Sequence, residues 1–365
     1  MVSYCTNIHP GETWPEIFAN VRAHVPTVKA AVSARQAFPI GLRLSGRAAQ
    51  ELTPGESRRF REWCGAEGCF VTTLNGFPYG RFHGVPLKEG VYRPDWRDPE
   101  RLAYTRRLAE LLAGWLPEGQ RGSISTVPVG FRRTLTDGIG AAKAHLRASL
   151  EHLHGLAQAT GREILLALEP EPGCLLETTP DAVRFAEEMR LPSHLHRHLA
   201  VCYDCCHQAL QFERPAESLR LLREAGLRIG HVQVSSALRL LSPKLDPLER
   251  FCEPWYLHQT VGRRSGGELV RYDDLPEAIA ARMPGIEEWR VHFHVPVFVD
   301  ELADCRTTQP FLREVLPLFE PGTPLEVETY TWSVLPPDLR AGPVTDSLAR
   351  EIRWVAERLE ASAGA

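Results

Sequence analysis

The stretch ILLALEP, residues 164–170, shows the pattern that decides the fold, because an apolar run passes directly into a carboxylate at Glu169. A short apolar run that ends in a polar residue is typical of a buried parallel strand. The same pattern recurs outward along nearly the whole chain, with amphipathic helical stretches between the runs, at residues 2–8, 40–45, 70–75, 123–129, 199–204, 229–236, 289–298 and 325–332. This alternation predicts a parallel sheet covered by helices.

The nine runs are one more than a closed eightfold barrel needs. We expect WRVHFHVPVF, residues 289–298, to lie outside the barrel, because it ends a stretch from about Ala237 to Glu288 that breaks the rhythm. Within that stretch, residues 256–274 read as two extended runs around a Gly-rich turn. The 365 residues therefore predict one α/β domain over residues 1–365, a (β/α)₈ TIM barrel with an insertion at residues 237–288 near the C-terminal mouth.

Helix-start signals support this division of the chain. Thr13 and Glu16 have the spacing of a capping box. Asp98 precedes Pro99, and Thr179 precedes Pro180, which predicts an N-cap residue followed by a proline in the first helical position.

The composition restricts the class of protein. A hydrophobic fraction of 43% and a charged fraction of 24% are those of an ordinary globular chain. The net charge of -4 provides no basic field, so we expect no nucleic-acid partner. The nine cysteines form no paired CxxC motifs, which favours reduced thiols, and no apolar run approaches the ~20 residues of a membrane span. We expect a cytoplasmic protein without membrane insertion.

Polar side chains stand where the expected strands end, which is where such barrels place their active groups. Side chains two residues apart share one face of a strand, so Glu169, Asp204, Gln233 and Glu328 can all point inward. Several buried carboxylates repel one another unless a cation neutralises them. The pattern therefore predicts a divalent metal ion, with oxygen ligands favouring Mn²⁺, Mg²⁺ or Co²⁺ and additional imidazole favouring Zn²⁺.

Several of these motifs occur together in known proteins. In order, LALEPEP (166–172), YDCCH (203–207), GHVQVSS (230–236) and LEVETYTW (325–332) resemble the xylose-isomerase-like superfamily of sugar isomerases, sugar epimerases and related hydrolases. The opening YCTNIHPGETW (4–14), with TLNGFPYG (73–80), RVHFHVPVF (290–298) and VETYTW (327–332), resembles the bacterial metabolite-traffic protein EboE family over essentially the full length. The motifs are specific as a set and weak individually.

The resemblance to the keto-sugar epimerases implies a role for each matched position. It implies that Glu169 is a metal ligand and a base, Asp204 a second ligand, and Glu328 the opposite ligand and base. It also implies that His207 contacts a substrate oxygen. The sequence departs from the family at Gln233, where the family has a histidine ligand. Three alternatives follow: the Gln233 amide binds the metal, His294 replaces the missing imidazole, or the site has lost its metal.

Other polar residues are candidates for the substrate pocket. We expect His207, Asn75, Glu171 and His292 to bind substrate, and Asn7, His9, Phe77 and Tyr79 are further candidates for the pocket wall. The structural alternatives are a helix cap for Glu171, turn formation for the asparagines and rim packing for the aromatic residues. We expect His231 to be a packed core residue.

Three functions fit these residues. The first is a metal-dependent isomerase or epimerase that moves a proton next to the carbonyl of a small metabolite. The second is a metabolite-binding or traffic protein that keeps the pocket without catalysis and works with partner proteins of the same pathway. The third is a metal-dependent hydrolase of the endonuclease-IV type, which the acidic charge balance disfavours.

Overall fold

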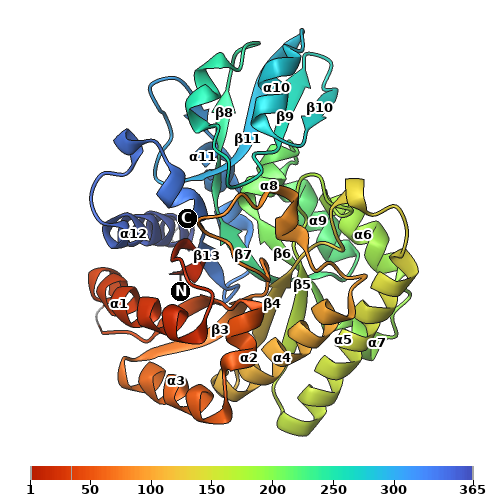
Figure 1. The fold of residues 1–365 in the computed structure, drawn as a ribbon, viewed down its shortest axis with the longest axis vertical. Coiled ribbons are helices and arrows are strands. Elements are labelled where there is room, and N and C mark those ends of the chain that lie inside the picture. Colours follow the sequence, from red (N-terminus) through yellow and green to blue (C-terminus); the bar gives the residue numbers. More distant parts are fainter. Residues whose placement is uncertain (1, 34, 364–365) are drawn as a thin grey trace.

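Eight parallel strands form a nearly closed barrel in which neighbours follow chain order (Figure 1). The structure is a computed structural model, and it describes residues 2–33 and 35–363. A single bridge between Cys5 and Gly41 joins the first strand to the second. The barrel strands are β1 (Val2–Tyr4), β2 (Phe38–Arg43), β3 (Cys69–Asn75), β4 (Gly122–Thr126), β5 (Ile164–Leu168), β6 (Leu199–Asp204), β7 (Arg228–Val234) and β13 (Leu325–Val327). The expected barrel fold is confirmed.

Helices surround the barrel, as Figure 1 shows. They are α1 (Trp14–Ser33), α2 (Gly46–Glu51), α3 (Pro54–Ala66), α4 (Pro99–Trp115), α5 (Ile139–Thr160), α6 (Thr179–Glu188), α7 (Ser193–His196), α8 (Cys205–Leu210), α9 (Pro215–Glu224), α11 (Gln309–Val315) and α12 (Val344–Ala363). Asp98 caps α4 as expected. The expectation for α6 is wrong by one residue, because Thr178 is the N-cap and forms a capping box with Asp181.

A second, five-stranded antiparallel sheet stands beside the barrel, at the top of Figure 1. Its strands are β8 (Ser236–Leu240), β9 (Thr260–Arg264), β10 (Leu269–Tyr272), β11 (Ile286–Val295) and β12 (Arg306–Thr307), and α10 (Leu275–Ala281) accompanies them. The run at 289–298 thus contributes to this sheet and not to the barrel, and 256–274 contains the antiparallel pair β9 and β10. The sheet extends to Thr307, beyond the expected limit at Glu288.

The barrel interior is filled by small and medium side chains. Leu165 and Ala167 of β5 meet Ala200 and Cys202 of β6 in a buried cluster separate from the main core. Alternation along these strands places Glu169 and Asp204 on the same inward face, one step closer to the mouth. The sequence predicts this inward orientation of Glu169 and Asp204.

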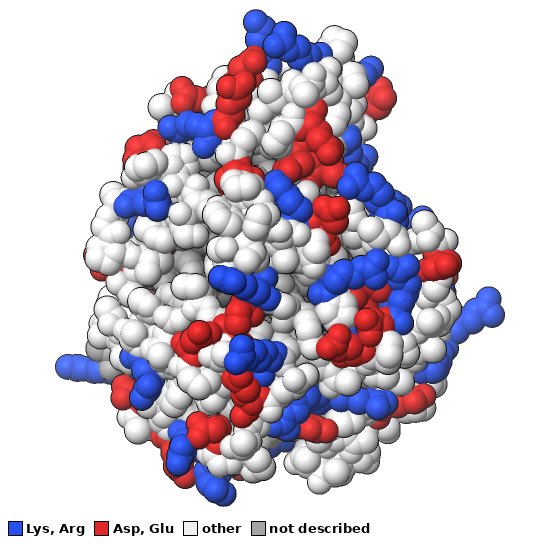
Figure 2. Space-filling model, viewed as in Figure 1, with Lys and Arg blue, Asp and Glu red and all other residues white. Residues whose placement is uncertain are grey.

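The outer surface carries charges of both signs. Figure 2 shows basic and acidic side chains interspersed over the face in view. Many of them form ion pairs: Glu163, for example, lies within 3.2 Å of Arg121, Arg197 and Arg228. Among the described residues, no helix combines the length and the apolar character needed to cross a lipid bilayer.

Candidate functional site

Three buried carboxylates meet at the mouth of the barrel. Glu169 follows β5, Asp204 ends β6 and Glu328 follows β13. One oxygen from each lies within 4.8 Å of the other two, and their exposed fractions are 3%, 0% and 4%. The structure therefore brings together the three acidic residues that the sequence singles out.

Hydrogen bonds hold one oxygen of Asp204 and leave the other free. Oδ1 accepts from the backbone N–H of His207 at 3.0 Å and from the Ser235 hydroxyl at 2.8 Å, so Asp204 is also the N-cap of α8. Oδ2 is buried and has no hydrogen-bond partner, and neither has Oε2 of Glu169. Leaving buried charged oxygens unpaired is costly, and a cation between them removes that cost. This donor set fits a divalent metal ion.

Glu328 is held by two asparagines. Its Oε1 accepts from Asn7 Nδ2 at 2.8 Å and from Asn75 Nδ2 at 3.4 Å. Asn75 ends β3 and also contacts Cys5 Sγ at 3.3 Å. The structure thus places Asn75, an expected substrate-binding residue, against a candidate metal ligand.

The electrostatics of the three carboxylates reflect their burial and proximity. Burial, followed by repulsion from Asp204 and Glu171, raises the pKa of Glu169 well above its usual range. Burial and then Glu169 and Asp204 raise the pKa of Glu328 in the same way. Burial also acts to raise the pKa of Asp204, but His207, His294 and the hydrogen bonds to Oδ1 outweigh it, so this pKa is lowered. The group therefore favours one anion unless a cation is present.

Three histidines lie next to the carboxylates. His207 comes from α8, and His292 and His294 come from β11 of the second sheet. His292 Nε2 lies 3.2 Å from His207 Nε2 and 3.2 Å from His294 Nε2. His294 Nδ1 lies 3.7 Å from Glu328 Oε2, while His207 Nε2 and His294 Nε2 lie 3.8 Å and 4.0 Å from Asp204 Oδ2. Burial lowers the pKa of His292 well below its usual value and that of His294 to about 4.

Glu171 occupies the rim beside His207. Its Oε1 accepts from the Tyr92 hydroxyl at 2.8 Å, while its buried Oε2 has no partner. A Glu171 oxygen also lies within 4.8 Å of ring nitrogens of His207 and His292. Burial raises its pKa to about 7. Glu171 is therefore part of the mouth and does not cap α6, whose cap is Thr178.

Gln233 lies deeper, on β7. Its Cα partners are Asp204 on one side and Glu326 on the other, and both polar atoms of its amide are buried without a partner. Glu326 is a buried carboxyl that sequence reasoning did not select, and burial raises its pKa to about 7. Gly41 makes room for it, because a Cβ at that position would lie 2.3 Å from Glu326 Oε2.

The remaining candidates divide between the mouth and the core. Asn7 and Phe77 line a hollow at the mouth, partly open to solvent, together with Phe82, Val91, Tyr92, Tyr256 and Tyr330. His9 lies away from this hollow, stacked on His24, and Tyr79 bonds to Glu100. His231 is a core residue, as expected, with Nδ1 2.7 Å from the Ser123 hydroxyl.

Two residues of the mouth had no clear signal in the sequence. Gln259 and Tyr330 both contact His292, at 2.7 Å and 3.4 Å. Gln259 lies just before β9, in the segment expected to be an insertion, and its place depends on how the second sheet packs. Tyr330 is within the LEVETYTW motif, and only its closeness to Glu328 in the chain could have indicated it.

Comparisons with known proteins agree with the barrel. No family model and no curated protein matches the chain. Among solved structures, the IOLI protein with a binding zinc atom has a TM-score of 0.54 at 11% identity, covering 99% of this chain and 98% of that one. A xylose-isomerase-like TIM barrel protein from Mycobacterium smegmatis in complex with magnesium has a TM-score of 0.52 at 12% identity, covering 98% and 99%.

A third structure is D-psicose 3-epimerase with D-tagatose from Clostridium cellulolyticum H10. Its TM-score is 0.51 at 12% identity, and the match covers 99% of this chain and 98% of that chain. At these identities the likeness is one of fold. The chain has the xylose-isomerase-like TIM-barrel fold.

Proposed function

We propose that this protein is a divalent-metal-dependent isomerase or epimerase that moves a proton next to the carbonyl of a small metabolite. The observation that carries the proposal is the convergence of Glu169, Asp204 and Glu328, each with an oxygen within 4.8 Å of the others. Oε2 of Glu169 and Oδ2 of Asp204 have no hydrogen-bond partner and are available to a cation. We include Gln233 as a further oxygen donor, because its buried amide is unpaired beside Asp204.

The chemistry follows from the positions of the two glutamates. A divalent ion held here would act as a Lewis acid on a carbonyl oxygen of the substrate. Glu169 follows β5 and Glu328 follows β13, and β6 and β7 lie between these two strands, so the two carboxyls approach the mouth from different sides. With Oε2 given to the cation, the other oxygen of Glu169, Oε1, would take a proton from the carbon next to the carbonyl, and a protonated Glu328 would return one to the opposite side of that carbon. Asn7 and Asn75 hold Glu328 in place for this task.

Three solved structures of the same fold support the proposal. Their descriptions name magnesium, zinc and an epimerase with a sugar ligand. For this chain, oxygen ligation by carboxylates favours Mn²⁺, Mg²⁺ or Co²⁺ at the carboxylate group.

Metal analysis tests the site. Metal-free protein is refilled with Mn²⁺ or Co²⁺, and bound metal is measured for the wild type, Glu169→Gln and Asp204→Asn. We expect stoichiometric metal in the wild type at the carboxylate group and its loss in both variants. Glu213→Gln is the matched control, because Glu213 is a partly buried carboxyl that accepts hydrogen bonds from Thr179, outside this group. Equal metal content in all four proteins contradicts the proposal.

Solvent exchange tests the chemistry. Wild-type protein loaded with Mn²⁺ or Mg²⁺ is incubated in D₂O with a panel of ketoses and keto acids, and deuterium next to the carbonyl is followed by NMR. We expect exchange with at least one compound and its loss in Glu328→Gln. A panel of compounds is needed because the two glutamates and the metal site specify a carbon next to a carbonyl but do not identify the rest of the substrate.

A second candidate is a metabolite-binding or traffic protein without turnover, as the EboE resemblance suggests. It is favoured by Gln233 in place of a histidine and by the aromatic wall of the mouth, which includes Phe77, Phe82 and Tyr256. This candidate predicts ligand-induced thermal stabilisation without deuterium exchange. Exchange that depends on Glu328 excludes it.

A further inference from the structure

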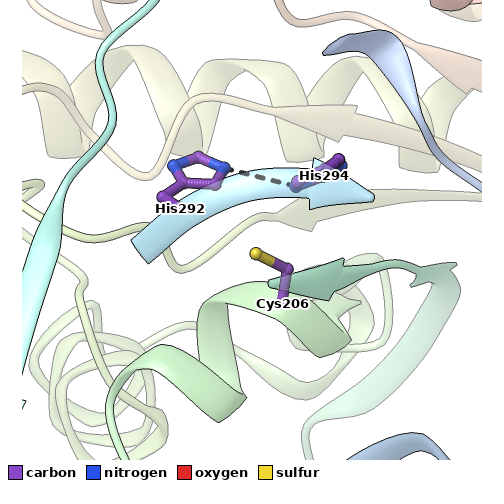
Figure 3. A group of neighbouring side chains, drawn as sticks. All are labelled: Cys206, His292 and His294. Atoms are coloured by element: carbon purple, nitrogen blue, oxygen red, sulfur yellow. Dashed lines mark hydrogen bonds between the residues drawn. The ribbon is translucent and has the colours of Figure 1, made fainter. Parts of the chain in front are cut away.

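The hollow at the mouth has two chemically different ends. Its inner end is polar and is lined by Asn7, Glu169, Glu171, Glu328, His207, His292 and His294. Figure 3 shows two of these imidazoles, those of His292 and His294, on β11. Its outer end is apolar and is lined by Phe77, Pro78, Phe82, Leu87, Val91, Leu257 and the rings of Tyr92, Tyr256 and Tyr330. A molecule that fills the hollow therefore meets carboxylates at one end and apolar surface at the other.

Two segments that are far apart in the sequence build the apolar end. Residues 77–92 belong to the connection between β3 and α4, and residues 256 and 257 come just before β9. The Leu87 N–H donates to the Trp255 carbonyl oxygen at 2.9 Å, and the ring centroids of Phe82 and Tyr256 are 5.1 Å apart. The two segments thus form one packed wall.

The one lysine among the residues that line the hollow has its charge bound elsewhere. Lys88 Nζ donates to the carbonyl oxygens of Glu253 at 3.2 Å and Tyr256 at 2.7 Å, and to the Asp274 carboxylate at 2.6 Å. An ammonium group has three hydrogens, so these acceptors use all of them. The backbone of Lys88 has a φ of 42°, which a lysine seldom adopts, and these bonds stabilise it there. The apolar end therefore keeps no lysine free for a phosphate or carboxylate.

The hydroxyl hydrogen of Tyr256 is also bound. His83 Nε2 lies 2.6 Å from the carbonyl oxygen of Asn7, which can only accept, so Nε2 carries the hydrogen of the neutral ring. Burial lowers the pKa of His83 to about 4, which keeps the ring neutral near pH 7. Nδ1 is then an acceptor, and the Tyr256 hydroxyl at 2.9 Å donates to it.

The other two tyrosines direct their hydroxyls away from the apolar end. The Tyr92 hydroxyl donates to Glu171 Oε1 at 2.8 Å and accepts from Gln259 Nε2 at 2.7 Å. Tyr330 Oη lies 3.4 Å from His292 Nε2, at the polar end. The tyrosines therefore contribute rings, and not hydroxyl hydrogens, to the apolar end.

These contacts decide between a sugar chain and an apolar group as the occupant of the outer end. Aromatic rings can stack on either, so the available hydrogen-bonding groups make the difference. A hydroxyl group that leaves water without finding a partner lowers affinity. A methylene group buried against apolar surface raises affinity by about fourfold. The outer end thus suits hydrocarbon better than a chain of hydroxyl groups.

We propose that the substrate is a carbonyl compound with an alkyl or aryl group beyond its reacting end, and that Phe82, Leu87 and Val91 bind this group. The inference rests on the proposed function for the reacting carbonyl, and it adds the class of substrate. The carbonyl and its neighbouring carbon lie at the polar end beside Glu169 and Glu328. The rest of the molecule lies against the apolar wall.

Three hydroxyketones test the substrate class. L-erythrulose and 1-hydroxy-2-butanone have the same four-carbon chain and the same hydroxyketone group, neither closes into a furanose or pyranose, and they differ in two hydroxyl groups. The third, 1-hydroxy-2-hexanone, extends the hydrocarbon chain. Dissociation constants are measured by ligand-observed NMR titration of the full-length protein with Mg²⁺, and deuterium exchange is followed in D₂O. We expect 1-hydroxy-2-hexanone to bind at least about tenfold more tightly than L-erythrulose, with 1-hydroxy-2-butanone between them.

Two variants place a polar group in the wall. Leu87→Asn keeps a side chain of similar size, and Val91→Thr keeps the shape of the valine; both positions are partly buried. We expect each to lower the preference for 1-hydroxy-2-hexanone by about threefold or more. Leu241→Asn is the matched control, because Leu241 is 56% exposed and lies outside the hollow, and it should keep the wild-type ratio. Val91→Thr carries the test if Leu87→Asn fails to fold by circular dichroism.

The outcomes separate this inference from the proposed function. L-erythrulose that binds as tightly as 1-hydroxy-2-hexanone overturns the inference, and its exchange of deuterium would leave the proposed function standing. No measurable binding of any of the three compounds, or a wild-type ratio in the folded wall variants, also overturns the inference. Tighter binding of 1-hydroxy-2-hexanone that depends on the wall supports it, even if no deuterium is exchanged and the proposed function fails.

Discussion

Asn7 donates a hydrogen bond of 2.8 Å from Nδ2 to Oε1 of Glu328 and thereby joins the two ends of the barrel at its mouth. Asn7 follows β1, the first strand, and Glu328 follows β13, the last. The two residues are 321 positions apart in the chain. The orientation of a carboxylate at the candidate metal centre therefore depends on the amino-terminal segment.

Replacing Asn7 tests this dependence. Asn7→Ala removes the donor, so the Glu328 carboxyl can rotate away from the other two carboxylates. Loss of a residue that orients a metal ligand typically weakens metal binding by about 10- to 100-fold. We expect a decrease of that size in Mn²⁺ affinity, measured by titration calorimetry. Asn20→Ala is the control, since Asn20 lies on α1 away from the mouth and its amide donates to the Pro10 carbonyl at the surface. An equal decrease in Mn²⁺ affinity in both variants would argue against an orienting role for Asn7.

Glu351 gives a prediction for stability against pH. It is fully buried on α12 and accepts from Thr329 Oγ1 at 2.8 Å and from the Val297 N–H at 3.1 Å. Burial raises its pKa to about 7, from a usual value of 4.5. A carboxyl whose pKa is raised on folding favours the folded state below its unfolded pKa. This contribution is lost as the pH rises toward the folded pKa.

The free energy of unfolding of the metal-free protein should therefore fall between pH 4.5 and 7, and Glu351→Gln should reduce that fall. The difference is at most about 3 kcal/mol, because one pKa unit corresponds to about 1.4 kcal/mol. Urea unfolding at several pH values measures it. Glu360→Gln, an exposed glutamate on the same helix, should leave the slope unchanged. If the stability of Glu351→Gln falls with pH as steeply as that of the wild type, Glu351 is not the group that causes the fall.

Two glycine replacements should have opposite effects on stability. In Gly41→Ala the new Cβ would lie 2.3 Å from Glu326 Oε2 and 2.8 Å from the Tyr4 carbonyl oxygen, inside the barrel. Overpacking of this kind costs about 1–3 kcal/mol. In Gly65→Ala, on the exposed face of α3, nothing lies within 4 Å, and alanine should add about 0.5–1 kcal/mol. Thermal unfolding compares the two; a neutral Gly41→Ala would show that Glu326 can move aside.

The carboxylate group could be predicted from local pattern alone. Glu169, Asp204 and Glu328 each follow an apolar strand in the right phase, and parallel strands in a barrel end at one mouth. The pattern needed no knowledge of packing between distant elements. The break in the strand–helix rhythm before residues 289–298 likewise predicted that this run lies outside the barrel, and the strand order confirms it.

The histidine group could not be predicted in the same way. The sequence shows that His292 and His294 share one face of a strand, but their meeting with His207 depends on where the second sheet packs. Glu171 and Tyr92 meet for a similar reason, since a long loop crosses the mouth before α4. Asn75 was expected to bind substrate; at the end of β3 its amide donates to Glu328 Oε1 and accepts from the Phe77 N–H, contacts that the sequence alone does not indicate.

Ser235 is the only residue between β7 of the barrel and β8 of the second sheet. Its hydroxyl accepts from the Cys206 N–H at 2.9 Å and donates to Asp204 Oδ1 at 2.8 Å. The second sheet therefore begins one residue beyond a barrel strand, at a serine whose hydroxyl holds Asp204 Oδ1. A substitution that shifts the start of β8 would disturb both bonds and, through Asp204, the orientation of a candidate metal ligand.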